Sequence, residues 1–126
     1  MRLLLDTHVV LWELEGSRGV GPLAQAAIEE ATELAFSVVS YAEIGVKVAL
    51  GKLAVPGDLR EQILLSGVRT LGLAPEHGLG VATLPMHHRD PFDRLLISQA
   101  RCEGLTVLTA DARFADYDVA LIDAAA

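Results

Sequence analysis

Four acidic residues stand where an α/β fold could bring them together. Asp6 directly follows the apolar segment LLL, and Asp111 follows the apolar segment LTVLTA. Glu43 and Asp93 lie near the starts of two segments with helical spacing of apolar residues. An all-oxygen cluster of carboxylates selects Mg²⁺ or Mn²⁺ rather than zinc, and such ions next to a phosphate hydrolyse phosphate esters and diesters. The candidate chemistry is therefore metal-assisted hydrolysis.

Each acid except Asp6 readily has a purely structural explanation when taken alone. The segment SYAE fits a capping box between Ser40 and Glu43, and DPFD places Asp90 and Asp93 at the positive end of a helix dipole. Asp111 fits the start of a turn. Capping contributes about 0.3–1 kcal/mol per acid, whereas two carboxylates ~4 Å apart repel by roughly 4 kcal/mol at an effective dielectric of about 20. If the acids converge, a cation or protonation is required.

Alternating apolar segments predict the elements that would position these acids. Strands are expected over 3–6, 34–39, 69–73, 105–111 and 117–123, the last at an edge. Helices are expected over 7–16, 22–31, 41–50, 59–66, 75–84 and 91–103, with a loop over 16–22. The alternation implies parallel crossovers and the α/β class, a three-layer α/β/α sandwich with a central, mostly parallel sheet. Sites in such folds form at the carboxyl ends of strands, where Asp6 ends a strand expected to be central.

Composition predicts one domain over residues 1–126, with a surface that needs a partner. Hydrophobic residues make up 52% of the chain and charged residues 21%, and the mean hydropathy is +0.39. Some apolar surface is therefore expected to be covered by another protein or a second copy. No apolar run is long enough for a signal peptide or a membrane span, and the single cysteine suits a reducing compartment, so a cytoplasmic location is expected.

The net charge argues against nucleic-acid binding by bulk electrostatics. There are 17 acidic residues against 10 basic ones, which gives −7 at pH 7. Such a surface repels a phosphate backbone. Any role on nucleic acid would have to come from metal ions and a local basic patch.

Four segments together resemble a known family. In chain order they are LLLDTHVVLW, SVVSYAEIGVKVALGKL, LPMHHRDPFDRLLISQA and LTVLTADARFADYDV, and they are similar to PIN-domain ribonucleases of the VapC toxin type. The resemblance covers almost the whole chain. It implies a Mg²⁺ or Mn²⁺ site at Asp6, Glu43, Asp93 and Asp111, and endoribonuclease activity through a metal-activated water. It also implies a VapB-like antitoxin that covers the active site, and a homodimer.

Several neighbours of the acids are candidates for supporting roles. Thr7 and Thr109 could orient a carboxylate or bond the backbone at a strand end, and Asp90 is expected first as a helix cap and second as support for the metal ligands. The candidate phosphate contacts, with solvated surface charges as the alternative, are Arg89, Arg94, Lys47 and Lys52. His87 and His88 are expected to be surface groups, and Trp12 to lie in the core or at an interface.

Two other functions remain open from the sequence. A catalytically inactive PIN-like binding module would share the fold, although the full set of four acids argues against it. An α/β Mg²⁺-dependent phosphatase would use an aspartyl nucleophile, which Asp6 permits. The DxD spacing expected of such a phosphatase is absent, because the segment reads DTH. Activity on RNA or on a small phosphate ester would discriminate between these functions.

Overall fold

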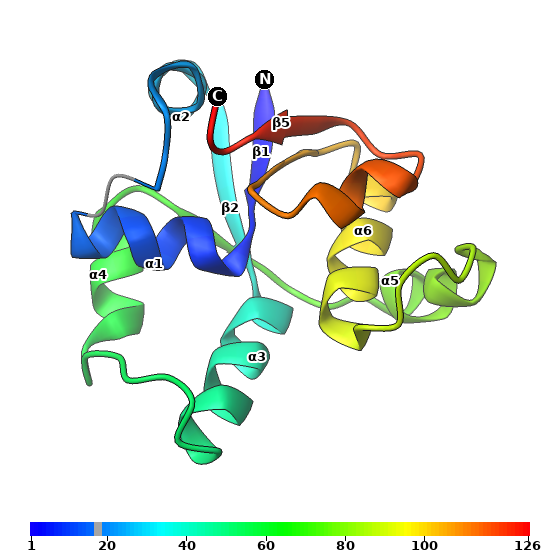
Figure 1. Ribbon diagram of the computed structural model, residues 1–126, viewed down its shortest axis with the longest axis horizontal. Helices are drawn as coiled ribbons and strands as arrows, with labels where there is room; N and C mark the ends of the chain where they lie inside the picture. The colour runs from blue at the N-terminus through cyan, green and yellow to red at the C-terminus, as the bar shows by residue number, and fades with distance from the viewer. Residues whose placement is uncertain (17–18) are drawn as a thin grey trace.

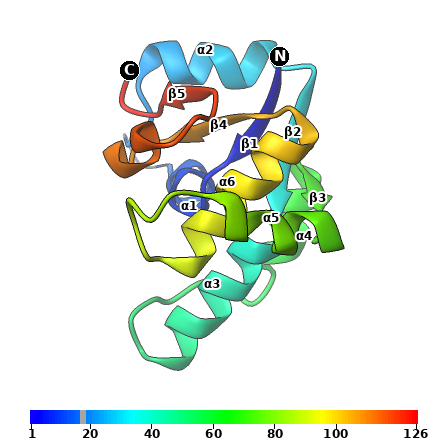
Figure 2. The same cartoon turned by 90° about the vertical axis from the view of Figure 1, so that its right-hand side faces the viewer.

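The computed structural model describes residues 1–16 and 19–126. Its sheet has five strands, all parallel, in the order β3-β2-β1-β4-β5 (Figures 1 and 2). The strands are β1 (Arg2–Leu5), β2 (Glu33–Ser37), β3 (Arg69–Leu71), β4 (Thr106–Thr109) and β5 (Leu121–Asp123). Each predicted strand is present, β1 is central, and β5 lies at an edge as expected.

The described residues form six α-helices and two 3₁₀ helices. They are α1 (Thr7–Glu15), α2 (Pro22–Glu30), α3 (Val38–Ala49), α4 (Leu59–Leu65), α5 (Pro75–Gly80), η1 (Val81–Thr83), α6 (Pro91–Glu103) and η2 (Ala112–Asp116). Only η2 had no counterpart in the prediction, because five residues give too little periodicity to mark a helix. Residues 17–18 of the predicted 16–22 loop lie outside the described residues. No helix in the described part is long and apolar enough to cross a membrane.

The central strand β1 joins two separate hydrophobic clusters. Leu3 and Leu5 pack with residues of α1, α2 and α4 on one face of the sheet. Leu4 packs with residues of α6 on the other face, and α5 lies against α6. Alternation along β1 thus buries both faces of the sheet, because successive side chains of a strand point to opposite sides. The three-layer α/β/α sandwich is confirmed (Figure 1).

Helix α3 begins earlier than predicted. Its cap is Ser37, whose hydroxyl accepts a hydrogen bond from the amide of Val39 at 3.0 Å. The predicted cap at Ser40, and with it the capping box to Glu43, is therefore wrong. The helix starts directly from the last residue of β2, so Ser40 lies inside its first turn and Glu43 in its second. From there α3 projects away from the carboxyl ends of the strands (Figures 1 and 2).

The order of the strands reverses between β1 and β4. Strands β2 and β3 follow β1 on one side of the sheet. The chain then returns to the other side of β1, where it forms β4 and β5. The amide of Asp6 donates to the carbonyl of Leu108 at 3.0 Å, which ties the end of β1 to β4. Ligand sites of open α/β sheets lie at such a reversal, outside the carboxyl ends of the strands.

Candidate metal-binding site

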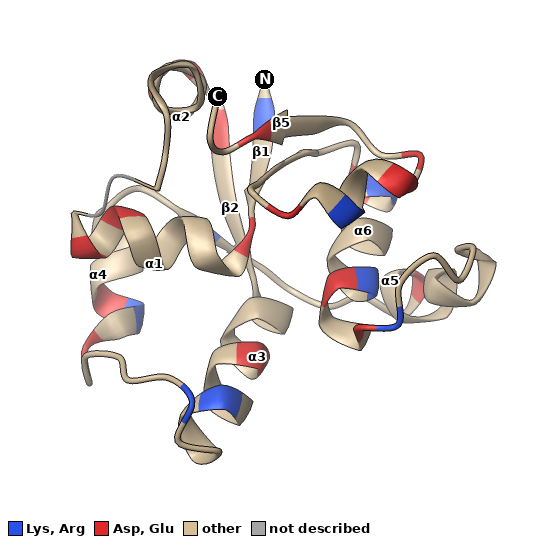
Figure 3. Cartoon of the chain, viewed as in Figure 1, with Lys and Arg blue, Asp and Glu red and all other residues tan. Residues whose placement is uncertain are grey.

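A hollow of about 250 Å³ opens where the strand order reverses. Its acidic lining residues are Asp6, Glu43, Asp90, Asp93 and Asp111. The remaining lining residues are His8, Trp12, Lys47, Ala110 and Arg113. The structure thus brings together the four acids proposed as ligands and Asp90, which the sequence indicated as a helix cap and as support for the ligands. In Figure 3, red segments at the end of β1, on α3, at the start of α6 and after β4 surround this region.

Asp6 is a buried carboxylate, 6% exposed, held by two neighbours. The hydroxyl of Thr109 donates to its Oδ2 at 2.7 Å, and the amide of Thr7 donates to its Oδ1 at 2.8 Å. Burial raises the pKa of Asp6 above its ordinary value, although these two hydrogen bonds oppose the effect. The charged form of Asp6 is therefore oriented by the protein but incompletely stabilised by it.

Glu43 has both carboxylate oxygens engaged. The hydroxyl of Thr7 donates to its Oε1 at 2.8 Å, and the Nζ of Lys47 lies 2.6 Å from its Oε2. The Thr7 hydroxyl is also 2.8 Å from the hydroxyl of Ser40. A hydroxyl has one hydrogen, so Ser40 donates to Thr7 while Thr7 donates to Glu43. Thr7 thus contacts Asp6 through its backbone and Glu43 through its side chain.

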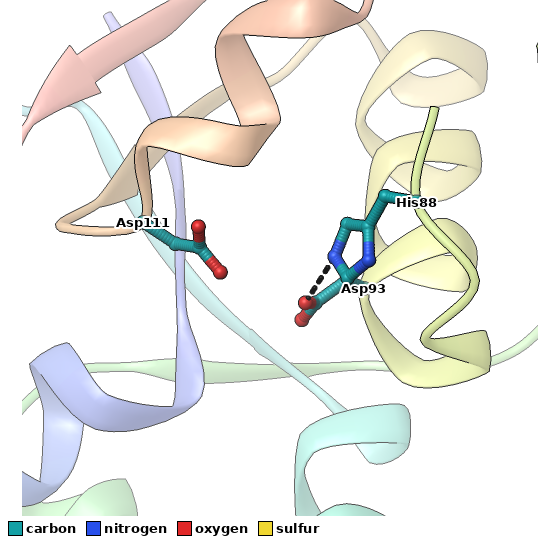
Figure 4. A group of neighbouring side chains, drawn as sticks. All are labelled: His88, Asp93 and Asp111. Carbon is teal, nitrogen blue, oxygen red and sulfur yellow. Dashed lines mark hydrogen bonds and ion pairs between the residues drawn. The ribbon is translucent and has the colours of Figure 1, made fainter. Parts of the chain in front are cut away.

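Asp93 is paired with His88 (Figure 4). The Nε2 of His88 lies 2.7 Å from Oδ2 of Asp93, and the amide of Asp90 donates to Nδ1 of the same ring at 3.3 Å. Because Nδ1 accepts, the proton is assigned to Nε2, which donates to Asp93. Burial raises the pKa of Asp93 to about 6; the His88 hydrogen bond opposes this, and the neighbouring Asp90 and Asp6 add to it.

The expectation that His88 is a surface group is wrong, since it is only 7% exposed. The loop before α6 folds back so that the imidazole lies over the first turn of the helix. Its neighbour His87 is exposed and packs edge-on against Tyr117. Asp90 caps α6 as predicted, accepting hydrogen bonds from the amides of Phe92 and Asp93.

Asp111 is half-buried and faces a cation. Its carboxylate accepts from the backbone amide of Arg113 at 2.9 Å and from the Nη2 of the same residue at 2.8 Å, and it caps η2. This pairing lowers the pKa of Asp111. One side-chain atom each of His88, Asp93 and Asp111 lies within 4.8 Å of the others. Figure 4 shows Asp111 facing Asp93 across a gap.

These residues fit a divalent cation that prefers oxygen ligands. Lys47 and Arg113 each neutralise one acid, while burial leaves Asp6 and Asp93 with raised pKa values. An adjacent cation stabilises the charged form of such acids. The donors on offer are carboxylate oxygens, which suit Mg²⁺ or Mn²⁺.

Comparison with known proteins identifies the family of the chain. Residues 3–120 match the family model of the PIN domain. The chain belongs to the PIN-domain family. This PIN domain is 32% identical over 118 residues to Ribonuclease VapC22 of Mycobacterium tuberculosis, and the match covers 91% of each chain. The family predicted from the sequence segments is confirmed.

Solved structures share the fold of this PIN domain. A chain from the crystal structure of VapBC2 from Rickettsia felis, bound to a DNA fragment from its promoter, has a TM-score of 0.73, 16% identity and 98% coverage of both chains. A chain of FitAcB from Neisseria gonorrhoeae has a TM-score of 0.70, 22% identity and 96% coverage of both chains. At these identities the likeness establishes the fold.

The candidate phosphate contacts of this PIN domain separate into three kinds. Lys47 lines the pocket, whereas Arg89 and Lys52 are exposed and are not among its lining residues. Arg94 is 6% exposed, and its guanidinium donates to Tyr117 and to several backbone carbonyls; it is not available to a phosphate, so its candidacy is wrong. Arg94 instead fastens the segment before α6 to that helix.

Besides Ala110, three lining residues of the PIN domain were not predicted from the sequence as part of the site. Arg113 follows Asp111 by two residues, which was the available signal. His8 and Trp12 are separated by four residues on α1, the spacing of one helix face. Trp12, expected in the core or at an interface, is half-buried and lines the pocket.

Proposed function

We propose that this PIN domain is a Mg²⁺- or Mn²⁺-dependent endoribonuclease, the toxin of a VapC-type toxin–antitoxin pair. The proposed metal ligands are Asp6, Glu43, Asp93 and Asp111. The observation that carries the proposal is the convergence of these acids in one pocket where the strand order reverses. The likeness to Ribonuclease VapC22 supports RNA as the substrate.

A divalent ion bound there supplies activation of water for in-line attack and stabilisation of the charge on the leaving oxygen. The chain itself fixes the directions of the acids. Thr109 and Thr7 hold Asp6, and Thr7 with Ser40 holds Glu43. A carboxylate held in this way needs little reorganisation when charge develops beside it.

Lys47 and Arg113, the two cationic side chains of the pocket, would attract RNA to a surface whose net negative charge otherwise repels it. Lys47 and Arg113 lie within hydrogen-bonding distance of Glu43 and Asp111, at the place where an ion would also bind. If Glu43 and Asp111 held an ion, Lys47 and Arg113 would be available to contact phosphates of the RNA backbone. Arg89 and Lys52 stay candidates for contacts farther along the strand. This supplies the local basic patch that a chain of charge −7 requires.

We further propose a VapB-like antitoxin, a homodimer and a cytoplasmic location, with residues 1–126 acting as one catalytic domain. Large apolar side chains are exposed on α3, just after it and on α4, namely Val46, Val48, Leu50, Leu64 and Leu65. An interface with another protein would remove such side chains from water. An acidic pocket suits a basic segment of an antitoxin. The structural neighbours include a toxin–antitoxin complex from Klebsiella pneumoniae, which supports a partner of this class.

The test is cleavage of a panel of mixed single-stranded RNAs by the protein free of antitoxin. We expect cutting with Mn²⁺, none with EDTA, and none by Asp93→Asn. Glu29→Gln, a matched loss of one charge on the exposed face of α2, should cut like the wild type. A folded protein that binds Mn²⁺ and cuts no RNA would overturn the proposal in favour of a binding module. Hydrolysis of a small phosphate ester without cleavage of RNA would favour the phosphatase.

A further inference from the structure

One wall of the acidic pocket is aromatic. His8 and Trp12 lie one turn apart on α1, and both line the pocket. Their ring centroids are 6.1 Å apart, and their planes differ by 26°. His8 is exposed and Trp12 is half-buried. Two nearly parallel rings are therefore presented to the pocket rather than to the hydrophobic core.

The indole of Trp12 is held in place by the backbone. A Cβ atom added at Gly19 would lie 2.7 Å from two carbons of the indole, too close for any side chain. The main chain at Gly19 thus packs directly against the ring. A ring held in position before a ligand arrives loses little conformational freedom on binding. His8 adds a second ring to the lining of the pocket that also contains Asp6.

The residues around these two rings indicate which kind of ligand the rings would bind. The same pocket holds the acids proposed to bind the ion, together with Lys47 and Arg113. A ligand that reaches both walls has a phosphate for the ion and cations and a flat apolar part for the rings. A nucleotide has both, because every nucleobase offers a π-face that stacks on aromatic side chains.

We propose that His8 and Trp12 form a nucleobase subsite, on which an unpaired base next to the scissile phosphate stacks. This inference rests on the proposed function and specifies its substrate. A base inside a duplex is stacked between its own neighbours and cannot present its face to a protein ring. The subsite therefore selects RNA that is single-stranded at the cleavage point.

The chain contains one tryptophan, so its fluorescence reports on this subsite alone. Wild-type protein with Mn²⁺ is mixed rapidly with a short single-stranded RNA, with an abasic strand of the same length, or with the same RNA paired in a duplex, and the emission is recorded before cleavage. We expect the single-stranded RNA to quench the emission and the other two to leave it nearly unchanged. Equal quenching by the abasic strand, or quenching by no RNA, would overturn the subsite.

Steady-state cleavage gives the second readout. For Trp12→Leu we expect KM for single-stranded RNA to rise roughly 10-fold while kcat changes little, because stacking is lost but the ion site is kept. Trp12→Phe should recover most of the loss. His8→Ala should raise KM by a smaller factor. Glu15→Gln, an exposed change on the same helix, is the matched control. Unchanged KM in both Trp12 variants contradicts the subsite.

These results separate the subsite from the nuclease. Metal-dependent cleavage with no effect of the bases refutes the subsite and leaves the nuclease intact. Base-dependent quenching by a protein that cuts no RNA supports the subsite and refutes the nuclease. Mn²⁺ binding and thermal melting of each variant verify that the fold is retained.

Discussion

His88 donates from Nε2 to Oδ2 of Asp93 across 2.7 Å while its Nδ1 accepts the amide hydrogen of Asp90 (Figure 4). With both nitrogens engaged, the imidazole is fixed in orientation and in tautomer. A lone pair on Nε2 is not available in this tautomer, so the ring positions Asp93 instead of binding the ion itself. Its hydrogen bond engages one oxygen of the carboxylate only.

This relationship predicts a loss of metal affinity in a variant that retains all four acids. His88→Ala should weaken Mn²⁺ binding roughly 10- to 100-fold, the usual effect of removing a group that orients a ligand. Isothermal titration calorimetry measures the affinity. His87→Ala, a change to the exposed neighbouring histidine, is the control and should bind as the wild type does. Equal affinities in the two variants would show that His88 does not position Asp93.

The raised pKa of Asp93 predicts a pH-dependent stability of the metal-free protein. Burial raises this pKa from 3.8 to about 6, so the folded state retains a proton that the unfolded chain releases as pH rises between these values. Below pH 4 the buried Asp93 is protonated and carries no charge, so its burial does not lower the free energy of unfolding. As the pH rises through 6, Asp93 becomes charged in the folded protein and the free energy of unfolding falls. Relative to Asp93→Asn, the wild type should lose about 2 kcal/mol over this window. Urea unfolding in EDTA at pH 4 and pH 7.5 measures the difference, and a constant difference would contradict the assignment.

Divalent ions should reverse that loss at neutral pH. Mn²⁺ at 100 times its Kd should stabilise the wild type by about 2.7 kcal/mol, because it binds the folded state alone. Asp6→Asn and Asp93→Asn should each stay folded, lose most of this stabilisation and nearly abolish RNA cleavage. Thermal melting with and without Mn²⁺ gives the stabilisation. Full cleavage by either variant would remove that residue from the metal site.

Arg94 and Lys47 should behave in opposite ways. Arg94→Ala leaves several buried carbonyls without a donor and should destabilise the protein by about 3 kcal/mol. Lys47→Gln should change stability much less, raise KM for RNA and reduce its dependence on salt, since a phosphate contact is lost. Urea unfolding and cleavage at two salt concentrations distinguish the two effects. A stable Arg94→Ala protein with weak RNA binding would return that arginine to the substrate.

The sequence predicted the parts of the site that depend on topology. The carboxyl ends of parallel strands meet at one edge, so the acids after β1 and β4 had to approach one another once the strands were recognised. It did not predict contacts that depend on how irregular segments pack. The fold of the loop before α6 decides that His88 reaches Asp93 and that Arg94 is buried. Helix α3 starts earlier than predicted because Ser37, the last residue of β2, caps it in place of Ser40.

The hydrogen bond between the Asp6 amide and the Leu108 carbonyl ties the first strand of the chain to one formed about a hundred residues later. Asp6 and Asp111 follow these two strands, and nothing holds them close together before β4 docks beside β1. A chain still emerging from the ribosome therefore has no assembled centre. The acidic pocket is complete only when β4 has docked beside β1.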